Sequence, residues 1–180
     1  MERSQGQTHL YGNQLTEKDN PVIIFRGKLD TLCAMIIEAQ LLGEEQGNTA
    51  FVDDLQQILE FVRLLLKAEY NGSPVGDFRL LGMTSAEMRE SSHHPEKYFG
   101  RRHLLMHHSM GALSISVNTL RTAVREVEIA AIEAFRDTDE PSKCRREDIV
   151  EALNRLSSLF YILIYKYLPE NYSPVGDSGI

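Results

Sequence analysis

The stretch NTAFVDDLQQILEFVRLLLKAEY, residues 48–70, shows the clearest helical pattern in the chain. Its apolar residues recur every three or four positions, which is the spacing of one face of an α-helix. These residues are Phe51, Leu55, Ile58, Val62 and Leu65. Asn48 or Thr49 can cap the first turn, and the turn-forming sequence NGSPVGD at 71–77 ends the pattern. The stretch therefore predicts an amphipathic helix that must pack against other helices.

The rest of the chain predicts partners of the same kind. Helices are expected over about Gly27–Leu42, Gly111–Phe135 and Arg146–Leu168. A shorter helix is expected after Thr84, where Thr84 and Glu87 have the spacing of a capping box. No segment shows sustained alternation with a period of two, so strands are not predicted. The expected fold is all-α: a five-helix bundle of four long helices and a short one.

The bundle is expected to form one domain, residues 22–168. Residues 1–21 are polar, with glycine, glutamine, asparagine and proline, and predict a flexible N-terminal segment. Residues 169–180 predict a loose C-terminal tail. A chain of 180 residues has enough length for one domain with a real core.

Composition excludes several classes of protein. A net charge of −7 disfavours binding to the phosphate backbone of nucleic acids. No apolar run approaches the roughly 18 residues of a membrane span, and the N-terminus has no apolar signal core. Two cysteines cannot form a disulfide framework or a four-thiolate zinc site. A cytoplasmic protein without a membrane or nucleic-acid partner is expected.

The helix predicted over 111–135 carries a polar face at helical spacing. Its members are Ser114, Asn118, Arg121, Arg125, Glu128 and Ile132. Two arginines one turn apart, followed by a glutamate, are typical of a solvated ion-pair face, but they equally suit an anion-binding site. The last helix has a polar stripe of its own, with Asn154, Ser157 or Ser158, Tyr161 and Tyr165. Asn154 lies either at the surface or in the same pocket as Arg125.

Five of the six histidines lie in SSHHPEKYFGRRHLLMHHSMG, residues 91–111. His103 and His107 are four residues apart, so a helix there would place two metal ligands on one face. Two ligands do not complete a tetrahedral site, and no cysteine lies nearby. Three interpretations remain open: a pocket wall, a polar loop or a transition-metal site. We predict no bound metal.

Four segments in order resemble the cobalamin adenosyltransferases of the five-helix type, and most closely the ethanolamine-utilisation branch. They are GKLDTLCAMI, FVDDLQQILEFV, VNTLRTAVREVE and EALNRLSSLFYIL, and SHHPEKYFGRRHL also resembles that branch. The propanediol-utilisation branch has an Arg-Thr-x-x-Arg-Arg-x-Glu-Arg motif, from which this chain departs at Glu126 and Ile129. Its Asn-Arg-Leu-Ser-Asp motif is matched except at Ser158. The resemblance covers residues 22–168.

Two regions of the family have no match here. The lysine- and threonine-rich nucleotide loop of the propanediol branch is absent, and Arg26 and Lys28 are the basic residues that could replace it. The metal-binding N-terminal region of the ethanolamine branch, with a histidine and clustered cysteines, is also unmatched, since residues 1–21 contain one histidine and no cysteine.

The resemblance implies transfer of the 5′-deoxyadenosyl group of ATP to cob(I)alamin, which makes adenosylcobalamin and releases triphosphate. The substrates and cofactors are then ATP, Mg²⁺ and a corrinoid. By the same resemblance, the catalytic residues are Arg125, Asp30 and Arg121, with Asp30 and Arg121 paired across a subunit interface. Residues implied to bind the nucleotide are Arg26, Lys28, Arg125, Glu128 and Asn154. An apolar wall implied to exclude the lower axial ligand of cobalt would come from Tyr98, Phe99, Leu105 and Met106, with Leu104 beside them.

The resemblance also implies partners: a reductase that supplies electrons to cobalt, and further copies of the chain. The expected assembly is a homotrimer, with a homodimer as the alternative. Because the nucleotide loop is absent, a second function stays open, that of a non-catalytic corrinoid-binding or chaperone-like relative. A third is a structural helical bundle without a ligand.

Overall fold

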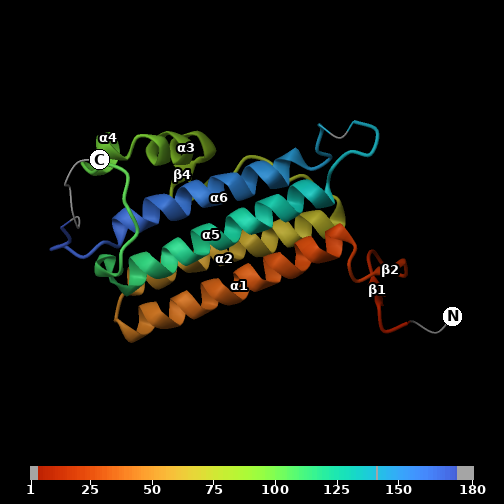
Figure 1. Ribbon diagram of the computed structural model, residues 1–180, viewed down its shortest axis with the longest axis horizontal. Helices are drawn as coiled ribbons and strands as arrows, with labels where there is room; N and C mark the ends of the chain where they lie inside the picture. Colours follow the sequence, from red (N-terminus) through yellow and green to blue (C-terminus); the bar gives the residue numbers. More distant parts are fainter. Residues whose placement is uncertain (1–3, 141, 174–180) are drawn as a thin grey trace.

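Four long helices lie side by side in the computed structural model, which describes residues 4–140 and 142–173 (Figure 1). They are α1 (Pro21–Glu45), α2 (Thr49–Asn71), α5 (Gly111–Ala134) and α6 (Glu147–Lys166). The predicted all-α bundle is confirmed. None of the helices in the described part of the chain combines the length and the apolar character needed to cross a bilayer.

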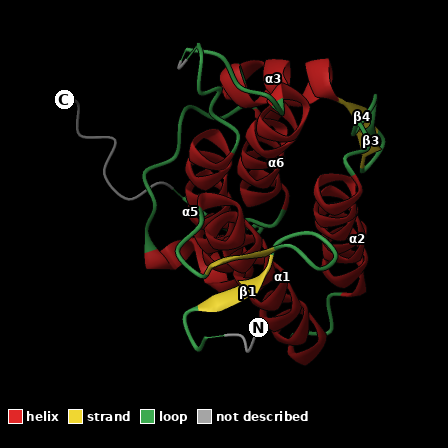
Figure 2. Cartoon of the chain, turned by 90° about the vertical axis from the view of Figure 1, so that its right-hand side faces the viewer, coloured by secondary structure: helices red, strands yellow, loops and turns green. Residues whose placement is uncertain are grey.

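Short helices and hairpins lie outside the four long helices. Helix α3 (Ser85–His93) lies against α6, as the end-on view shows (Figure 2). It is followed by the one-turn helix α4 (Pro95–Phe99), an irregular segment over 100–107 and the 3₁₀ turn η1 (His108–Met110). Two small antiparallel hairpins complete the fold: β1 (Gln7–His9) with β2 (Leu15–Glu17), and β3 (Arg79–Leu80) with β4 (Met83–Thr84).

The helix boundaries follow the capping chemistry of the sequence. The Asn48 side chain accepts a hydrogen bond from the amide of Phe51 at 3.0 Å, and the capping box of Thr84 and Glu87 forms as predicted. The start of α1 was predicted six residues too late. Asn20 accepts from the amide of Val22 at 2.9 Å, and Pro21 occupies the first helical position, where its missing N–H costs nothing.

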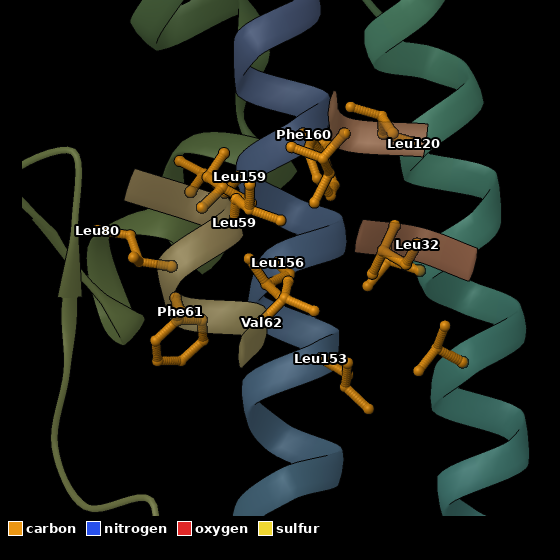
Figure 3. Close-up of a cluster of buried hydrophobic side chains, with 14 of the residues drawn as sticks. Leu32, Leu59, Phe61, Val62, Leu80, Leu120, Leu153, Leu156, Leu159 and Phe160 are labelled. Atoms are coloured by element: carbon orange, nitrogen blue, oxygen red, sulfur yellow. The ribbon is translucent and has the colours of Figure 1, made fainter. Parts of the chain in front are cut away.

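One continuous apolar core joins the four long helices. Leu32 of α1, Val62 of α2 and Leu120 of α5 are fully or almost fully buried, and they surround Leu156 and Phe160 of α6 (Figure 3). Removing a side chain of this size from such a core costs about 2 to 5 kcal/mol. The apolar stripes read from the sequence therefore face one another and fix the positions of the polar faces.

The N-terminal segment, whose flexibility stays a prediction, contains the β1–β2 hairpin. This hairpin is joined to the bundle through Arg26, which donates two hydrogen bonds to the carboxylate of Glu69, at 2.7 and 3.1 Å, and one to the carbonyl of Leu10 at 2.7 Å. Tyr11 donates to the same carboxylate at 2.7 Å. The side chain of Glu69 is only 1% exposed, so these donors compensate a buried charge.

The C-terminal tail is likewise attached as far as it is described. Tyr172 is buried, and its carbonyl accepts a hydrogen bond from Arg101 at 3.4 Å. The remainder of the predicted loose tail, residues 174–180, lies outside the described residues.

Candidate functional site

The polar faces predicted on the last two long helices meet along the contact between α5 and α6. At one end Ser114 donates to the carbonyl of Ile164 at 3.1 Å, and at the other Asn154 donates to Glu128 at 2.8 Å. These two bonds show that the helices run antiparallel. Between them the guanidinium of Arg121 lies over the ring of Tyr161, 5.6 Å from its centre. Ser114 is fully buried, so its role is structural.

Arg121 and Arg125 place two positive charges one turn apart at this contact. Arg121 is half-buried, and its Nε donates to Asn118 at 3.2 Å. Burial lowers the pKa of Arg121, and the charge of Arg125 lowers it further. Arg125 is exposed, and within the described residues no hydrogen bond or ion pair engages its side chain. A bound anion would stabilise both positive charges, and each guanidinium can donate two parallel hydrogen bonds to phosphate oxygens.

Beside this arginine pair, polar contacts join Glu128 of α5 to two residues of α6. Glu128 accepts from Asn154, and the oxygen of the Asn154 side chain accepts from Nη2 of Arg155. These bonds fix the orientation of the Asn154 amide, with its NH₂ toward α5 and its oxygen toward Arg155. One oxygen of Glu128 is used by Asn154, and the other has no partner among the described residues. A carboxylate oxygen is therefore available one turn from Arg125.

The other end of the face contains a histidine and two tyrosines. His103 Nδ1 and the Tyr161 hydroxyl are 2.8 Å apart, and the hydroxyls of Tyr161 and Tyr165 are 2.9 Å apart. Tyr165 donates to the carbonyl of Arg102 at 3.1 Å. Because that bond uses the Tyr165 proton, Tyr161 donates to Tyr165 and His103 donates from Nδ1 to Tyr161. The chain of bonds leaves Nε2 of His103 free to accept a proton or bind a ligand.

These bonds hold the irregular segment over 100–107 against α6. Phe99 stacks on the ring of Tyr165, with 4.6 Å between the ring centres. Burial and the hydrogen bond to Tyr161 raise the pKa of Tyr165 far above its usual value, so its hydroxyl stays protonated and keeps its bond to Arg102. The helix considered for His103 and His107 is not formed. Gly100 ends α4 in a left-handed conformation, with a φ of 63°, and the following residues are irregular.

The four residues predicted to form an apolar wall differ in how far they are exposed to solvent. Tyr98 is 44% exposed and Leu105 is 83% exposed, whereas Phe99 and Met106 pack partly against the core. Leu105 is a large apolar side chain that buries little of its surface in the single chain. Its exposure, next to His103, makes it the clearest apolar contact point for a ligand in this segment.

The histidines do not form a cluster within the described part of the chain. There, no three His, Cys, Asp or Glu side chains are grouped as metal ligands would be. His107 bonds to Ser109 at 2.9 Å, while His103 bonds to Tyr161. The absence of a bound metal stays a prediction.

Arg26 and Lys28 are engaged in bonds within the chain. All three guanidinium nitrogens of Arg26 donate to Glu69 or Leu10, as described above. Lys28 forms an ion pair of 3.0 Å with Glu126 on α5. A nucleotide bound by Arg26 would have to replace a nearly buried ion pair, whereas Lys28 and Glu126 are exposed and separate at little cost.

Asp30 is exposed on α1, on a strip that also presents Ile37 and Leu41. Within one copy of the described residues it forms no ion pair with Arg121. The two residues lie on adjacent helices, α1 and α5, which pack against each other. Their predicted contact across a subunit interface stays a prediction.

Comparison with known proteins identifies the fold that this site belongs to. Residues 2–167 match the protein family described as cobalamin adenosyltransferase. The chain belongs to the cobalamin adenosyltransferase family. The family predicted from the sequence motifs is thereby confirmed.

Within this family, the chain is similar to proteins named corrinoid adenosyltransferase EutT. That of Escherichia coli strain K12 is 31% identical over 157 residues, which are 87% of this chain and 57% of the relative. That of Salmonella typhimurium strain LT2 is 30% identical over 157 residues, with the same coverage. The chain thus spans 57% of the length of these relatives. No solved structure matches it.

Sequence reasoning found the polar faces of this cobalamin adenosyltransferase chain but missed their connections. Glu69 gave no signal, because its partner Arg26 lies 43 positions away in the sequence. Arg102 contributes a backbone carbonyl, which no side-chain pattern reveals. Arg89 was also missed; it is an exposed residue of α3, the short helix that packs against α6.

Proposed function

We propose that the chain is an ATP:corrinoid adenosyltransferase, which moves the 5′-deoxyadenosyl group of ATP to cob(I)alamin. The names of its relatives support the reaction class. The observation that carries the proposal is the pair of Arg121 and Arg125 on α5, where a half-buried and an unengaged cation lie one turn apart. This pair of positive charges suits a polyphosphate. The reaction needs no side-chain nucleophile, because cob(I)alamin itself is the nucleophile.

In the proposed reaction the two arginines act on the leaving group. Cob(I)alamin is the nucleophilic substrate: an electron pair from cobalt forms the bond to C5′ of ATP. The bond from C5′ to oxygen breaks, and its electrons leave with triphosphate. Arg125 stabilises the growing negative charge on that oxygen, and Arg121, held by Asn118 and Tyr161, adds a second positive charge in a fixed position.

Glu128 fits a role in holding Mg²⁺. Its unengaged carboxylate oxygen lies one turn from Arg125, and Asn154 fixes the other oxygen at 2.8 Å. Proteins often hold Mg²⁺ with one or two carboxylates together with the phosphates of the substrate. When bound, the ion would neutralise part of the triphosphate charge.

The corrinoid would lie on the 98–106 side of α6. Leu105 offers an exposed apolar surface, and Tyr98 offers a second one. Phe99 and Met106 anchor residues 98–106 to the bundle, because both side chains pack against its apolar core. An apolar surface against the lower face of the corrin would exclude the lower axial ligand and make the cobalt easier to reduce.

An assay of cobalt–carbon bond formation tests the proposal. The purified chain is mixed with Mg²⁺, ATP and cobalamin that has been reduced chemically to cob(I)alamin, so that no reductase is needed. The expected products are adenosylcobalamin, seen by its absorbance, and one triphosphate for each. Corrinoid binding without ATP consumption would refute the enzyme and favour the alternative below.

The alternative is a corrinoid-binding or chaperone-like relative that does not use ATP. One observation favours it: Arg26 and Lys28, the basic residues closest to the missing nucleotide loop, are both ion-paired within the chain. Binding assays with cobalamin and with ATP separate the two functions, since the alternative predicts a saturable response to cobalamin alone.

The proposal includes an assembly of identical chains and a reductase in the cytoplasm. Ile24 of α1 and Ile129 of α5 are 44% and 68% exposed and line one groove between the helices. Ile37 and Leu41 of α1 and Ile132 of α5 are further exposed apolar side chains on the same two helices. Exposed apolar patches of this kind are typical of interfaces, so we propose a homotrimer or homodimer formed through α1 and α5.

A further inference from the structure

Helix α3 lies beside α6 (Figure 2). A second groove, separate from the α5–α6 face, lies between these two helices. It has a volume of about 940 Å³ and is lined by Arg89 and His93 of α3 and by Glu151 and Arg155 of α6, among others. Arg89 and Arg155 face the same space from opposite walls. We name it the α3–α6 groove.

The two arginines have unused hydrogen-bond donors. The guanidinium of Arg89 forms no hydrogen bond or ion pair with the described residues, although its backbone carbonyl accepts from Ser92 and His93. Nε of Arg155 is the single buried side-chain nitrogen or oxygen of the described residues that has no hydrogen-bond partner. A buried donor without a partner is costly, and a bound acceptor would offset that cost.

Arg89 and Arg155 bring two positive charges to the groove, which the carboxylates of Glu90 and Glu151 also line. The pKa of Arg155 is lowered by burial and, next, by the positive charge of Arg89. Glu151 offsets part of this charge, but its carboxylate accepts from Ser85 at 3.3 Å and forms no ion pair with either arginine. His93 and His94 line the groove on the other side of Arg89. The guanidinium fork of Arg89 and the unpartnered Nε of Arg155 are donors that match the oxygens of a phosphate group.

We propose that the α3–α6 groove binds a phosphate oxyanion between Arg89 and Arg155. Arg89 supplies a fork from α3, and Arg155 supplies Nε while its Nη2 stays bonded to Asn154. The phosphate could be a free ion or polyphosphate, or the phosphodiester of a larger molecule. The proposal needs neither ATP hydrolysis nor corrinoid chemistry, so it can fail or succeed independently of the proposed function.

NMR titration tests the site directly. The wild-type chain is titrated with inorganic phosphate at constant ionic strength, and the side-chain Nε–H resonances of arginine are followed. We expect a saturable shift of the Arg155 resonance, and a loss of affinity of tenfold or more in Arg89→Ala. Arg63→Ala removes an exposed arginine of α2 outside the groove and should leave the affinity unchanged.

Further variants and ligands sharpen the test. Arg155→Lys keeps the charge but removes the Nε donor, so binding should weaken in a folded protein. Glu151→Gln removes the competing carboxylate and should tighten binding. Tripolyphosphate and dimethyl phosphate identify the source, because the tighter ligand shows whether the site prefers a free polyphosphate or a diester. Linear, unsaturated shifts that are equal in wild type, Arg89→Ala and Arg63→Ala would overturn the proposal.

Discussion

At the scale of single residues, the proposed function depends on the contrast between Arg121 and Arg125. Arg121 is held in place by Asn118 and Tyr161, whereas Arg125 is free to meet a ligand. The first is therefore positioned before any substrate binds, and the second adapts to it. Preorganised charge of this kind stabilises a transition state without reorganisation at the moment of reaction.

Arg125→Ala should lower the rate of adenosyl transfer and leave the fold intact, because the side chain is exposed and packs on nothing. Loss of a bidentate, charged contact to triphosphate removes about 2 to 4 kcal/mol of transition-state stabilisation. The measurement is kcat/KM for ATP, with circular dichroism to establish folding. Arg63→Ala is the matched control on α2. Near-normal turnover in folded Arg125→Ala would exclude this arginine from the reaction.

Asp148 provides a residue-scale prediction about pH. Its hydrogen bonds from Arg146, at 2.9 Å, and from the amide of Val75, at 3.0 Å, hold its pKa below the usual value. In the unfolded chain the pKa is about 3.9. The stabilisation is therefore present above that pH and is lost as pH falls through the lower folded value.

Asp148→Asn should therefore unfold at lower urea than wild type at pH 7. The difference in the free energy of unfolding should shrink toward pH 3 and below, where the wild-type carboxylate also becomes neutral. Urea titrations between pH 7 and pH 2 measure this, with the exposed loop variant Asp139→Asn as the control. A difference that stays constant across the range would show that charge at Asp148 contributes nothing.

At the scale of elements, helices were predictable and the segments between them were not. Apolar spacing marked α2, α5 and α6 because their buried faces are long and continuous. Capping chemistry marked α3. The start of α1 was missed although Asn20 and Pro21 form a recognisable signal, because the polar residues before them suggested a flexible lead-in. The β1–β2 hairpin has strands of three residues, too short for any alternation to be visible.

In the candidate site, likewise, groupings within one helix were predictable and contacts between elements were not. Residues that share a helix face, such as Arg121, Arg125 and Glu128, could be grouped from spacing alone. The contact of Glu128 with Asn154 required the relative register of α5 and α6, which depends on core packing. The position of His103 depends on an irregular segment whose path is set by Gly100 and by the Tyr165–Arg102 bond.

Tyr165→Phe tests how this irregular segment is held. The variant keeps the stacking on Phe99 but loses the hydroxyl that links Tyr161 to the carbonyl of Arg102. Removing such a bond costs about 0.5 to 1.5 kcal/mol, and the effect should be local. Amide hydrogen exchange over 101–106 should accelerate while exchange in α2 stays slow.

Tyr98→Phe is the control for that experiment, because the Tyr98 hydroxyl interacts with Lys97 of the same helix and has no hydrogen bond to residues 100–107 among the described contacts. It should leave exchange in the segment unchanged. Equal exchange rates in wild type and Tyr165→Phe would show that packing of Phe99 and Met106, and not the tyrosine hydroxyls, holds the segment in place.

At the scale of the whole molecule, α1 and α5 form a face that leaves large apolar side chains exposed in a single chain. Both helices expose isoleucines, and Asp30 lies exposed on α1 beside them. Arg121, on α5, has no carboxylate partner within the described residues. A second copy packed on this face would bury the isoleucines. We predict that it also brings Asp30 of one copy to Arg121 of another, so that assembly and the proposed function depend on the same contact.

A double-mutant cycle on Asp30 and Arg121 decides whether that contact exists. If the pair forms across the interface, removing either partner leaves an unpaired charge, at a cost of about 3 to 5 kcal/mol in assembly. Asp30→Ala and Arg121→Ala should each shift the protein toward monomer in sedimentation equilibrium, and the double variant should be little worse than either. Glu60→Ala, which removes an exposed carboxylate of α2 outside this face, is the control and should assemble normally. Additive losses in the double variant would mean that the two residues act separately, and the site would then be complete within one chain.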